Sequence, residues 1–229
     1  LLRRVARLPG VDRVRFITSH PKDLDQETIR VMAGEQEVCP QLHLPMQAGS
    51  SRVLKRMGRG YDRERYLDLA RSVQEAVPGL ALTTDVIVGF PGETEEDFQQ
   101  TLDAVQEAGF EGSFSFCYSD RPGTAAEKLP DKLGRDVQLD RLYRLQKLQD
   151  VITRKVLSDQ VGLVTEVLLE GPSRMQDEEH SFWRGRDPQG RMVNLAMPAQ
   201  QGRSGAMVRV RITQAKNHSL TGERIGEPW

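Results

Sequence analysis

The sequence predicts an α/β domain followed by a small all-β domain. Over residues 1–158, apolar runs of strand length alternate with segments of helical periodicity, which predicts a parallel sheet with helical crossovers. Over residues 159–229, five short strand-like runs are separated by turn residues, as is typical of a small barrel of the OB-like sort. Because the pattern changes near residue 158, we expect the domain boundary there.

Composition narrows the possible function classes. The chain has 229 residues, 38% of them hydrophobic and 28% charged, and a formal net charge of -1. This is ordinary for a soluble protein and gives no global attraction to nucleic acid. No apolar run is long enough to span a bilayer and no signal-peptide pattern opens the chain, so we expect a cytoplasmic protein with no membrane partner. Because the chain starts with Leu rather than Met, we also expect it to be a fragment of a longer protein.

The chain contains two cysteines, Cys39 and Cys117, which lie far apart in apolar or strand-like settings. Two isolated thiols predict neither a disulfide framework nor a cluster or zinc site. We therefore expect two free thiols and no metal ligands.

Local signals justify each element of the first domain. The predicted strands are residues 11–18, 38–45, 80–88 and 113–119. The predicted helices are residues 1–8, 23–33, 51–57, 62–77, 95–108 and 135–157. Capping residues open three of them, namely Ser50 or Ser51, Asp62 and Thr94. Pro or Gly follows four of them, at Pro9-Gly10, Gly34, Pro78-Gly79 and Gly109. Four strands are too few to close a barrel, so we expect an open sheet.

The second domain is predicted from its turns. Its strands are expected at residues 161–169, 181–185, 191–196, 206–213 and 220–225. Asp187, Pro188, Gln189 and Gly190 place proline and glycine where a type I turn favours them. Barrels of this size commonly bind single-stranded or looped nucleic acid.

Two segments of the first domain are candidate binding elements. Gly89, Pro91 and Gly92 form a tight turn at the carboxyl end of a strand, where a ligand can approach the backbone. A well-built turn with no ligand fits the same residues. Residues 52–65 carry six basic side chains, which fit either a solvated helix face or a phosphate-contacting surface. At this point the residues leave these alternatives open.

Several ordered motifs carry a resemblance to a known family. They are TSHP at 18–21, LHLPMQAGS at 42–50, RGY at 59–61, DVIVGFPGET at 85–94, SFCYS at 115–119, RPGT at 121–124, LEG at 169–171, GR at 185–186 and VNL at 193–195. In this order and spacing the chain resembles the radical SAM methylthiotransferases, most closely the MiaB type that acts on tRNA. The resemblance covers essentially the whole sequence. Ala125 departs from the family, which usually has Pro after Gly-Thr.

The resemblance implies a fold and an activity. Residues 1–158 are expected to form the later part of a radical SAM β/α barrel, left open, and residues 159–229 a TRAM domain that binds RNA. The parent enzyme would add a methylthio group to C2 of an N6-modified adenosine next to the tRNA anticodon. One S-adenosyl-L-methionine (SAM) supplies the methyl group, and a second yields the 5′-deoxyadenosyl radical that abstracts the C2 hydrogen. The expected partners are therefore tRNA and SAM.

The family's two [4Fe-4S] clusters are held by cysteines that this chain lacks. Cys39 and Cys117 match neither the three N-terminal cluster cysteines nor the CxxxCxxC motif of such enzymes. Since those thiolates hold the iron that cleaves SAM, we expect the chain alone to be inactive and assign it no catalytic and no metal residue.

The resemblance also implies binding residues, which lie at the carboxyl ends of the predicted strands. SAM is expected to contact Gln47, Ser50, Asp85, Gly89, Pro91, Gly92 and Glu93. For Asp85, a buried and hydrogen-bonded structural carboxylate is an equal alternative, and His20 and His43 are expected to be structural. Substrate is expected to contact Tyr118, Ser119 and Arg121, the last through a phosphate.

RNA contacts are expected from the second domain as well. They are Arg174, Trp183, Arg184, Arg186, Arg191 and Lys216, with Phe182 as the alternative stacking group, since neighbours on a strand point to opposite faces. Three other functions stay open: a methylthiotransferase for threonylcarbamoyl-adenosine tRNA, one for a ribosomal-protein aspartate, and an RNA-binding module only. The RPGT and VNL motifs favour the MiaB-type resemblance over the first two of these alternatives.

Overall fold

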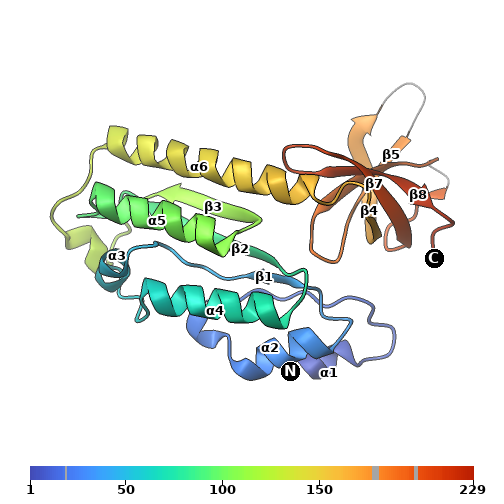
Figure 1. Ribbon diagram of the computed structural model, residues 1–229, viewed down its shortest axis with the longest axis horizontal. Coiled ribbons are helices and arrows are strands. Elements are labelled where there is room, and N and C mark those ends of the chain that lie inside the picture. Colours follow the sequence, from blue (N-terminus) through green and yellow to red (C-terminus); the bar gives the residue numbers. More distant parts are fainter. Residues whose placement is uncertain (19, 177–180, 199–200) are drawn as a thin grey trace. The chain divides into compact units, whose positions relative to one another are not determined.

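The computed structural model describes residues 1–18, 20–176, 181–198 and 201–229, without the side chains of residues 174–176 and 181. Contacts divide the chain into two units (Figure 1). The first comprises Leu1–Val38 and Leu42–Ile152, and the second comprises Cys39–Gln41 and Thr153–Trp229. In the described part of the chain, no helix is both long and apolar enough to cross a membrane.

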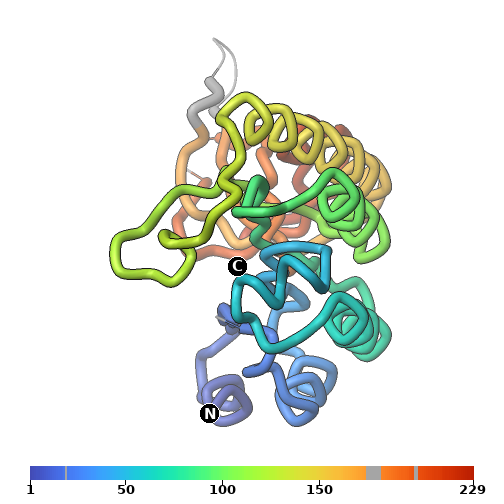
Figure 2. Tube along the Cα trace, turned by 90° about the vertical axis from the view of Figure 1, so that its left-hand side faces the viewer, coloured from blue at the N-terminus to red at the C-terminus, as the bar shows by residue number. Residues whose placement is uncertain are grey.

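The first unit is built on a three-stranded sheet in the order β1 (Gln41–His43), β2 (Ala81–Val88) and β3 (Gly112–Cys117). β2 and β3 are parallel, with Asp85 opposite Phe114 and Val88 opposite Cys117. The helices are α1 (Leu2–Ala6), η1 (Pro21–Asp23), α2 (Gln26–Gly34), α3 (Ser51–Arg56), α4 (Arg63–Ala76), α5 (Glu95–Ala108), η2 (Ala125–Lys128) and α6 (Arg135–Ser158). Figure 2 shows α4 and α5 side by side along the sheet.

The structure corrects the strand that we predicted at residues 11–18. Within it the described residues form only an isolated parallel bridge, from Val14 to Val38. Ile17, at the end of the predicted strand, is 82% exposed, and among the described residues the sheet begins at β1, so this segment does not join its ladder. The strand predicted at 38–45 likewise shortens to β1.

Helices cover one face of the sheet and leave the other open. Alternate residues of β2, such as Thr84 and Val86, are buried against α4 and α5, while Asp85 points to the opposite face. On that opposite face Phe114 and Phe116 of β3 are 61% and 54% exposed. The open sheet that the strand count predicted is therefore observed.

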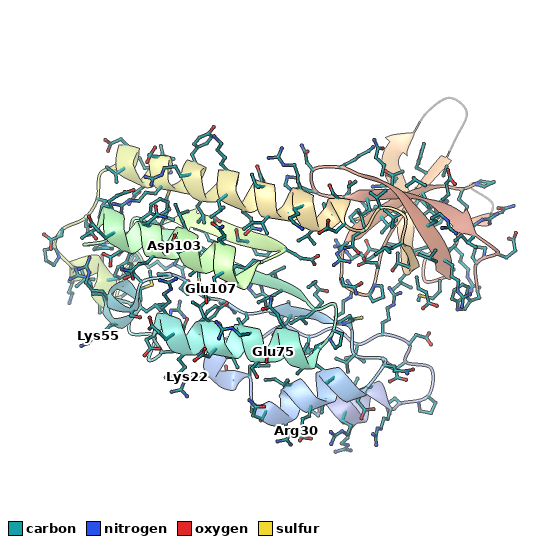
Figure 3. The ribbon with its side chains drawn as sticks, viewed as in Figure 1. Lys22, Arg30, Lys55, Glu75, Asp103 and Glu107 are labelled. Carbon is teal, nitrogen blue, oxygen red and sulfur yellow. The ribbon has the colours of Figure 1, made fainter. Side chains whose placement is uncertain are left out.

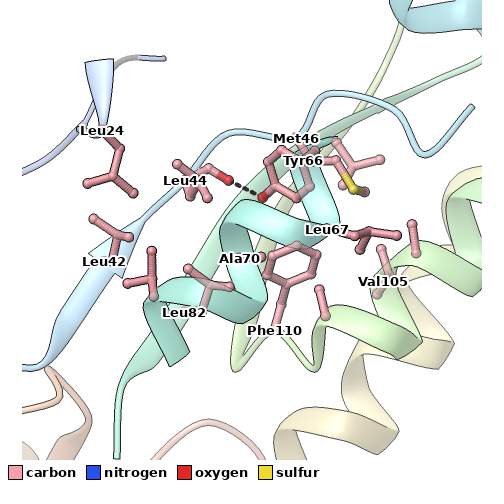
Figure 4. Close-up of a cluster of buried hydrophobic side chains, with 14 of the residues drawn as sticks. Leu24, Leu42, Leu44, Met46, Tyr66, Leu67, Ala70, Leu82, Val105 and Phe110 are labelled. Carbon is pink, nitrogen blue, oxygen red and sulfur yellow. Dashed lines mark hydrogen bonds between the residues drawn. The ribbon is translucent and has the colours of Figure 1, made fainter. Parts of the chain in front are cut away.

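The core of the first unit lies between β1, β2 and the helices (Figure 4). Tyr66 of α4 is buried there and donates its hydroxyl hydrogen bond to the Leu44 carbonyl at 2.6 Å. On the outer side of the helices, charges of both signs face solvent. Figure 3 shows them at Lys22, Arg30, Lys55, Glu75, Asp103 and Glu107.

The second unit contains a closed five-stranded barrel in the order β4-β5-β6-β8-β7. Its strands are β4 (Val164–Gln176), β5 (Ser181–Arg186), β6 (Met192–Ala196), β7 (Met207–Ala215) and β8 (Leu220–Ile225), close to the predicted runs. The predicted turn is present, with the Gly190 amide donating to the Asp187 carbonyl at 3.0 Å. Leu169, Val193, Val208 and Val210 are among the side chains that fill the barrel.

Candidate ligand-binding site

A cavity of about 640 Å³ opens at the carboxyl ends of β2 and β3. Ligands favour this edge of a parallel sheet because loops converge there. The cavity is lined by Gln47, Arg56, Met57, Gly58, Arg59, Asp85, Ile87, Phe90, Phe116, Cys117, Tyr118, Ser119, Arg121, Thr124, Ala125 and Ala126. The predicted residues Gln47, Asp85, Tyr118, Ser119 and Arg121 are thus brought together.

Gln47 reaches the cavity through a strained backbone. Its φ of 72° lies in the left-handed region, which costs a non-glycine residue about 1 kcal/mol or more. β2 holds this strained backbone in place. The Gln47 amide donates to the Asp85 backbone carbonyl at 2.8 Å, and the Ile87 amide donates to the Gln47 backbone carbonyl at 2.9 Å. This pairing fixes the Gln47 side chain at the cavity wall.

Asp85 is half-buried on the open face of the sheet. His43 Nε2 lies 3.4 Å from its Oδ2 atom, and His43 Nδ1 lies 3.0 Å from the Thr83 hydroxyl. The His43 ring also packs edge-on against Phe114. Asp85 therefore has a neighbour that orients it, and its carboxylate still lines the cavity and is able to accept hydrogen bonds from a ligand.

Gly89 and Glu93 build the turn from within. The buried Glu93 carboxylate accepts hydrogen bonds from the Gly89 amide at 3.1 Å and from Arg141 of α6 at 2.7 Å. Burial raises the pKa of Glu93, and these hydrogen bonds oppose that rise. Gly89 has a φ of +72°, and a Cβ there would lie 2.5 Å from Gln138. Neither residue appears among those that line the cavity, so both act on the shape of the loop.

Two arginines of the basic segment hold the same turn from the other side. Arg56 Nε donates to the Pro91 carbonyl at 3.1 Å, and Arg52 Nη2 donates to the Gly92 carbonyl at 2.6 Å. The Arg56 guanidinium occupies the space that a Cβ on Gly92 would need, 2.9 Å away. Arg52 and Arg56 therefore have a structural role in holding the turn, and we do not assign them to the phosphate-contacting surface that the sequence left open for residues 52–65.

Ser50 caps α3, as its position after the second strand predicted. Its hydroxyl accepts from the Val53 amide and donates to Asp97 Oδ1 at 2.6 Å. The side chain is fully buried and does not line the cavity. The structure therefore corrects the expectation that Ser50 contacts SAM directly.

The loop after β3 forms the remaining wall. Tyr118 packs edge-on against Phe90, with 5.2 Å between ring centroids, and its hydroxyl donates to Asp120 at 2.9 Å. Ser119 and Arg121 follow on the same wall. Phe90 was not among the predicted site residues, although it stands inside the glycine-proline turn.

In the barrel, the structure corrects the expectation for Trp183. Its ring lies in the barrel core, 8% exposed, and a Cβ on Gly202 would fall within the ring, so it is not a surface stacking group. Phe182, its neighbour, is half-buried.

The predicted barrel cations differ in their surroundings. Arg186 donates to Glu170 and to the Gly190 carbonyl, and Arg191 donates to Gln160. Arg184 is exposed, Lys216 carries a contact within the fold, and the Arg174 side chain lies outside the described residues.

The thiols are free, as predicted, with Cys39 buried and Cys117 half-buried at the cavity. Among the described residues, no group of three or more His, Cys, Asp or Glu side chains is placed to hold a metal ion. These residues therefore do not fit an iron-sulfur cluster.

Comparison with known proteins gives consistent similarities. The family model described as Radical SAM superfamily matches residues 1–105. A tRNA-2-methylthio-N(6)-dimethylallyladenosine synthase of Nitratidesulfovibrio vulgaris strain Hildenborough is 53% identical over 100% of this chain and 51% of its own length. Proteins of the same name from Oleidesulfovibrio alaskensis and Lawsonia intracellularis are 46% and 44% identical, over 99% and 98% of this chain and 52% and 49% of their own lengths.

The chain spans about half the length of the curated relatives that it matches. Among solved structures, coproporphyrinogen III oxidase (HemN) from Escherichia coli aligns with a TM-score of 0.48 and 16% identity, over 84% of this chain and 45% of that one.

Proposed function

Because this chain belongs to the radical SAM superfamily and to its MiaB-type methylthiotransferases, we propose that it binds SAM and the target nucleotide for methylthio transfer to tRNA. The observation that carries the proposal is the cavity at the carboxyl ends of β2 and β3, where Gln47, Asp85, Tyr118 and Arg121 converge. The relatives are named for a 2-methylthio-N6-dimethylallyladenosine product, and we assign N6-dimethylallyladenosine in tRNA to this chain as its substrate.

SAM needs polar groups at its ribose and its amino-acid end and room for its adenine. Asp85, oriented by His43, accepts from a ribose hydroxyl in this proposal, and the Gln47 amide contacts a second polar group. The turn at Gly89–Gly92, of which Phe90 lines the cavity, shapes the edge of the site in this proposal, and Glu93, Arg52 and Arg56 hold that shape. Because these hydrogen bonds already order the loop in the absence of a ligand, less binding free energy is lost in ordering it when SAM binds.

An iron-sulfur cluster supplies the electron for SAM cleavage in radical SAM chemistry. The described residues of this chain offer no cluster ligands, so its share of the reaction is binding and orientation. We assign the SAM and nucleotide positions to the first unit and RNA contact, as a TRAM domain, to the barrel.

The test of SAM binding uses isothermal titration calorimetry on the full chain. Asp85→Asn should weaken SAM binding about ten- to a hundredfold, because a ribose hydroxyl loses a charged acceptor worth about 1.5–3 kcal/mol. The matched control is Asp68→Asn, an exposed α4 residue paired only with Arg71, which should bind SAM as the wild type does. If the folded wild-type chain released or absorbed no heat on SAM titration, the assignment would be overturned.

The chain acting only as an RNA-binding module is the second candidate. The closed barrel with the exposed Arg184 favours it. Weak, salt-sensitive RNA binding without SAM binding would be its signature, and Arg184→Glu would reduce the RNA affinity.

A further inference from the structure

The cavity carries an excess of positive charge. Arg56, Arg59 and Arg121 line it, against the single carboxylate of Asp85. Arg56 is engaged through Nε with the Pro91 carbonyl, and its buried Nη2 atom has no hydrogen-bond partner among the described residues. Arg56 therefore adds positive charge to the cavity wall while its guanidinium holds the turn at Pro91.

The fold separates Arg59 from the other cations of its segment. Arg52 is bound to Asp97 and the Gly92 carbonyl, and Arg63 lies against Glu107. Lys55 and Arg65 line a separate hollow beside Tyr61. Of these cations, Arg59 joins Arg56 at the main cavity, and its guanidinium makes no hydrogen bond or ion pair with the described residues.

Arg121 supplies a cation from a second loop of the cavity, the one after β3, whereas Arg59 follows α3. A turn fixes its backbone, since the Thr124 amide and hydroxyl both donate to the Arg121 carbonyl, at 3.2 and 2.8 Å. Its side chain is exposed, and the described contacts pair it with no carboxylate. A fixed backbone with a free guanidinium is suited to catching an anionic group of a ligand.

Aromatic rings line the same cavity as the two cations. Phe90 and Tyr118 pack edge-on in the cavity wall, and Phe116 presents an exposed ring to the same space. Stacking surfaces beside free guanidinium groups match a nucleotide, whose base takes the rings and whose phosphate takes the cations.

We propose that Arg59 and Arg121 bind the phosphates flanking the target nucleotide, one from the loop after α3 and the other from the loop after β3, while the base lies against Phe90 and Tyr118. Arg59 is the new element, since the sequence left its segment open between a solvated helix face and a phosphate-contacting surface and assigned a phosphate only to Arg121. The inference rests on the proposed function in taking a nucleotide as substrate. It assigns the free cations to phosphate rather than to the carboxylate of SAM.

The test compares adenosine with adenosine 3′,5′-bisphosphate, which differ only in their phosphates, by calorimetry on the full chain. The bisphosphate should bind at least about tenfold more tightly, and Arg59→Ala and Arg121→Ala should each reduce that ratio about tenfold without changing adenosine affinity. Arg65→Ala, which removes a cation from the other hollow, should leave the ratio unchanged. Far-UV circular dichroism confirms that each variant is folded.

Parallel SAM titrations separate this inference from the proposed function. SAM affinity should be the same in Arg59→Ala and in the wild type. Equal affinity of the wild type for adenosine and its bisphosphate would overturn the phosphate assignment, and so would a loss of SAM affinity in Arg59→Ala, which would point to the SAM carboxylate. If adenosine and its bisphosphate bind equally but SAM still binds and Asp85→Asn still weakens its binding, the phosphate assignment fails while the proposed function stands.

Discussion

The side chain of Asp97 is buried at the start of α5 and accepts hydrogen bonds from three residues. Ser50 donates to it at 2.6 Å, the Thr94 amide and hydroxyl donate at 2.9 and 3.0 Å, and Arg52 pairs with both oxygens. Burial would raise the pKa of the Asp97 carboxyl, but the hydrogen bonds from Arg52, Ser50 and Thr94 outweigh it and hold that pKa well below its ordinary value of 3.8. The carboxylate thereby ties α3 to α5 beneath the glycine turn.

Asp97→Asn should lower the free energy of unfolding by about 2–3 kcal/mol, because it leaves the Arg52 charge and the donors around it without a carboxylate. The pKa is depressed in the folded state, so the ionised group contributes stability above pH 3.8 that is lost as pH falls through the folded pKa. The difference between wild type and variant, measured by urea unfolding, should therefore shrink below about pH 4.

The control for this prediction is Asp103→Asn, an exposed α5 residue that accepts only from Gln99. It should change the unfolding free energy by less than about 0.5 kcal/mol. A loss in Asp97→Asn no larger than in this control would show that the network does not stabilise the fold.

Among the elements, helix starts were predictable from local signals and most strands from their apolar pattern, but the sequence did not show whether a given strand has a neighbour to pair with. Ser50, Asp62 and Thr94 cap α3, α4 and α5 as predicted, because a capping side chain bonds an amide three residues away. The strand at 11–18 was wrong because a strand exists only through its neighbour.

The same distinction explains the site. The family resemblance implied Gln47, Asp85 and Tyr118 as binding residues, and they line one cavity because parallel strands present their carboxyl ends at one edge. The structural role of Arg52 was not predictable, because its partner Asp97 lies 45 positions along the chain. Trp183 was misassigned because alternation allows either neighbour to face the core, and only the structure selects one.

The loop after β1 approaches α5 closely, and Gly49 permits this contact. A Cβ on Gly49 would lie 2.5 Å from Thr101 Cα and 2.6 Å from the Gln100 carbonyl, both backbone atoms of a packed helix. Gly49→Ala should therefore reduce the free energy of unfolding by about 3 kcal/mol and weaken SAM binding, since this loop carries Gln47. Gly34→Ala is the matched control, because neither glycine has a left-handed φ and nothing lies within 4 Å of a Cβ at Gly34. Equal stability of the two variants in urea would contradict the prediction.

At the scale of the whole molecule, the two units have separate cores. Val105 and Phe98 belong to the core of the first unit, and Val208 and Val210 to the core of the barrel. The barrel is closed, so its ladder is completed within itself. A unit with its own core and no open edge meets the physical conditions for unfolding on its own.

The two tryptophans make this testable, because Trp183 and Trp229 both belong to the second unit. Tryptophan fluorescence should then report the barrel, while far-UV circular dichroism is weighted to the helices of the first unit, and the two urea curves should have different midpoints. Val208→Ala should move the fluorescence midpoint down by about 1 M or more, and Val105→Ala, equally buried, should move the dichroism midpoint instead. Coincident curves that shift together in both variants would show one cooperative unit, in which loss of the barrel would also abolish the cavity of the first unit.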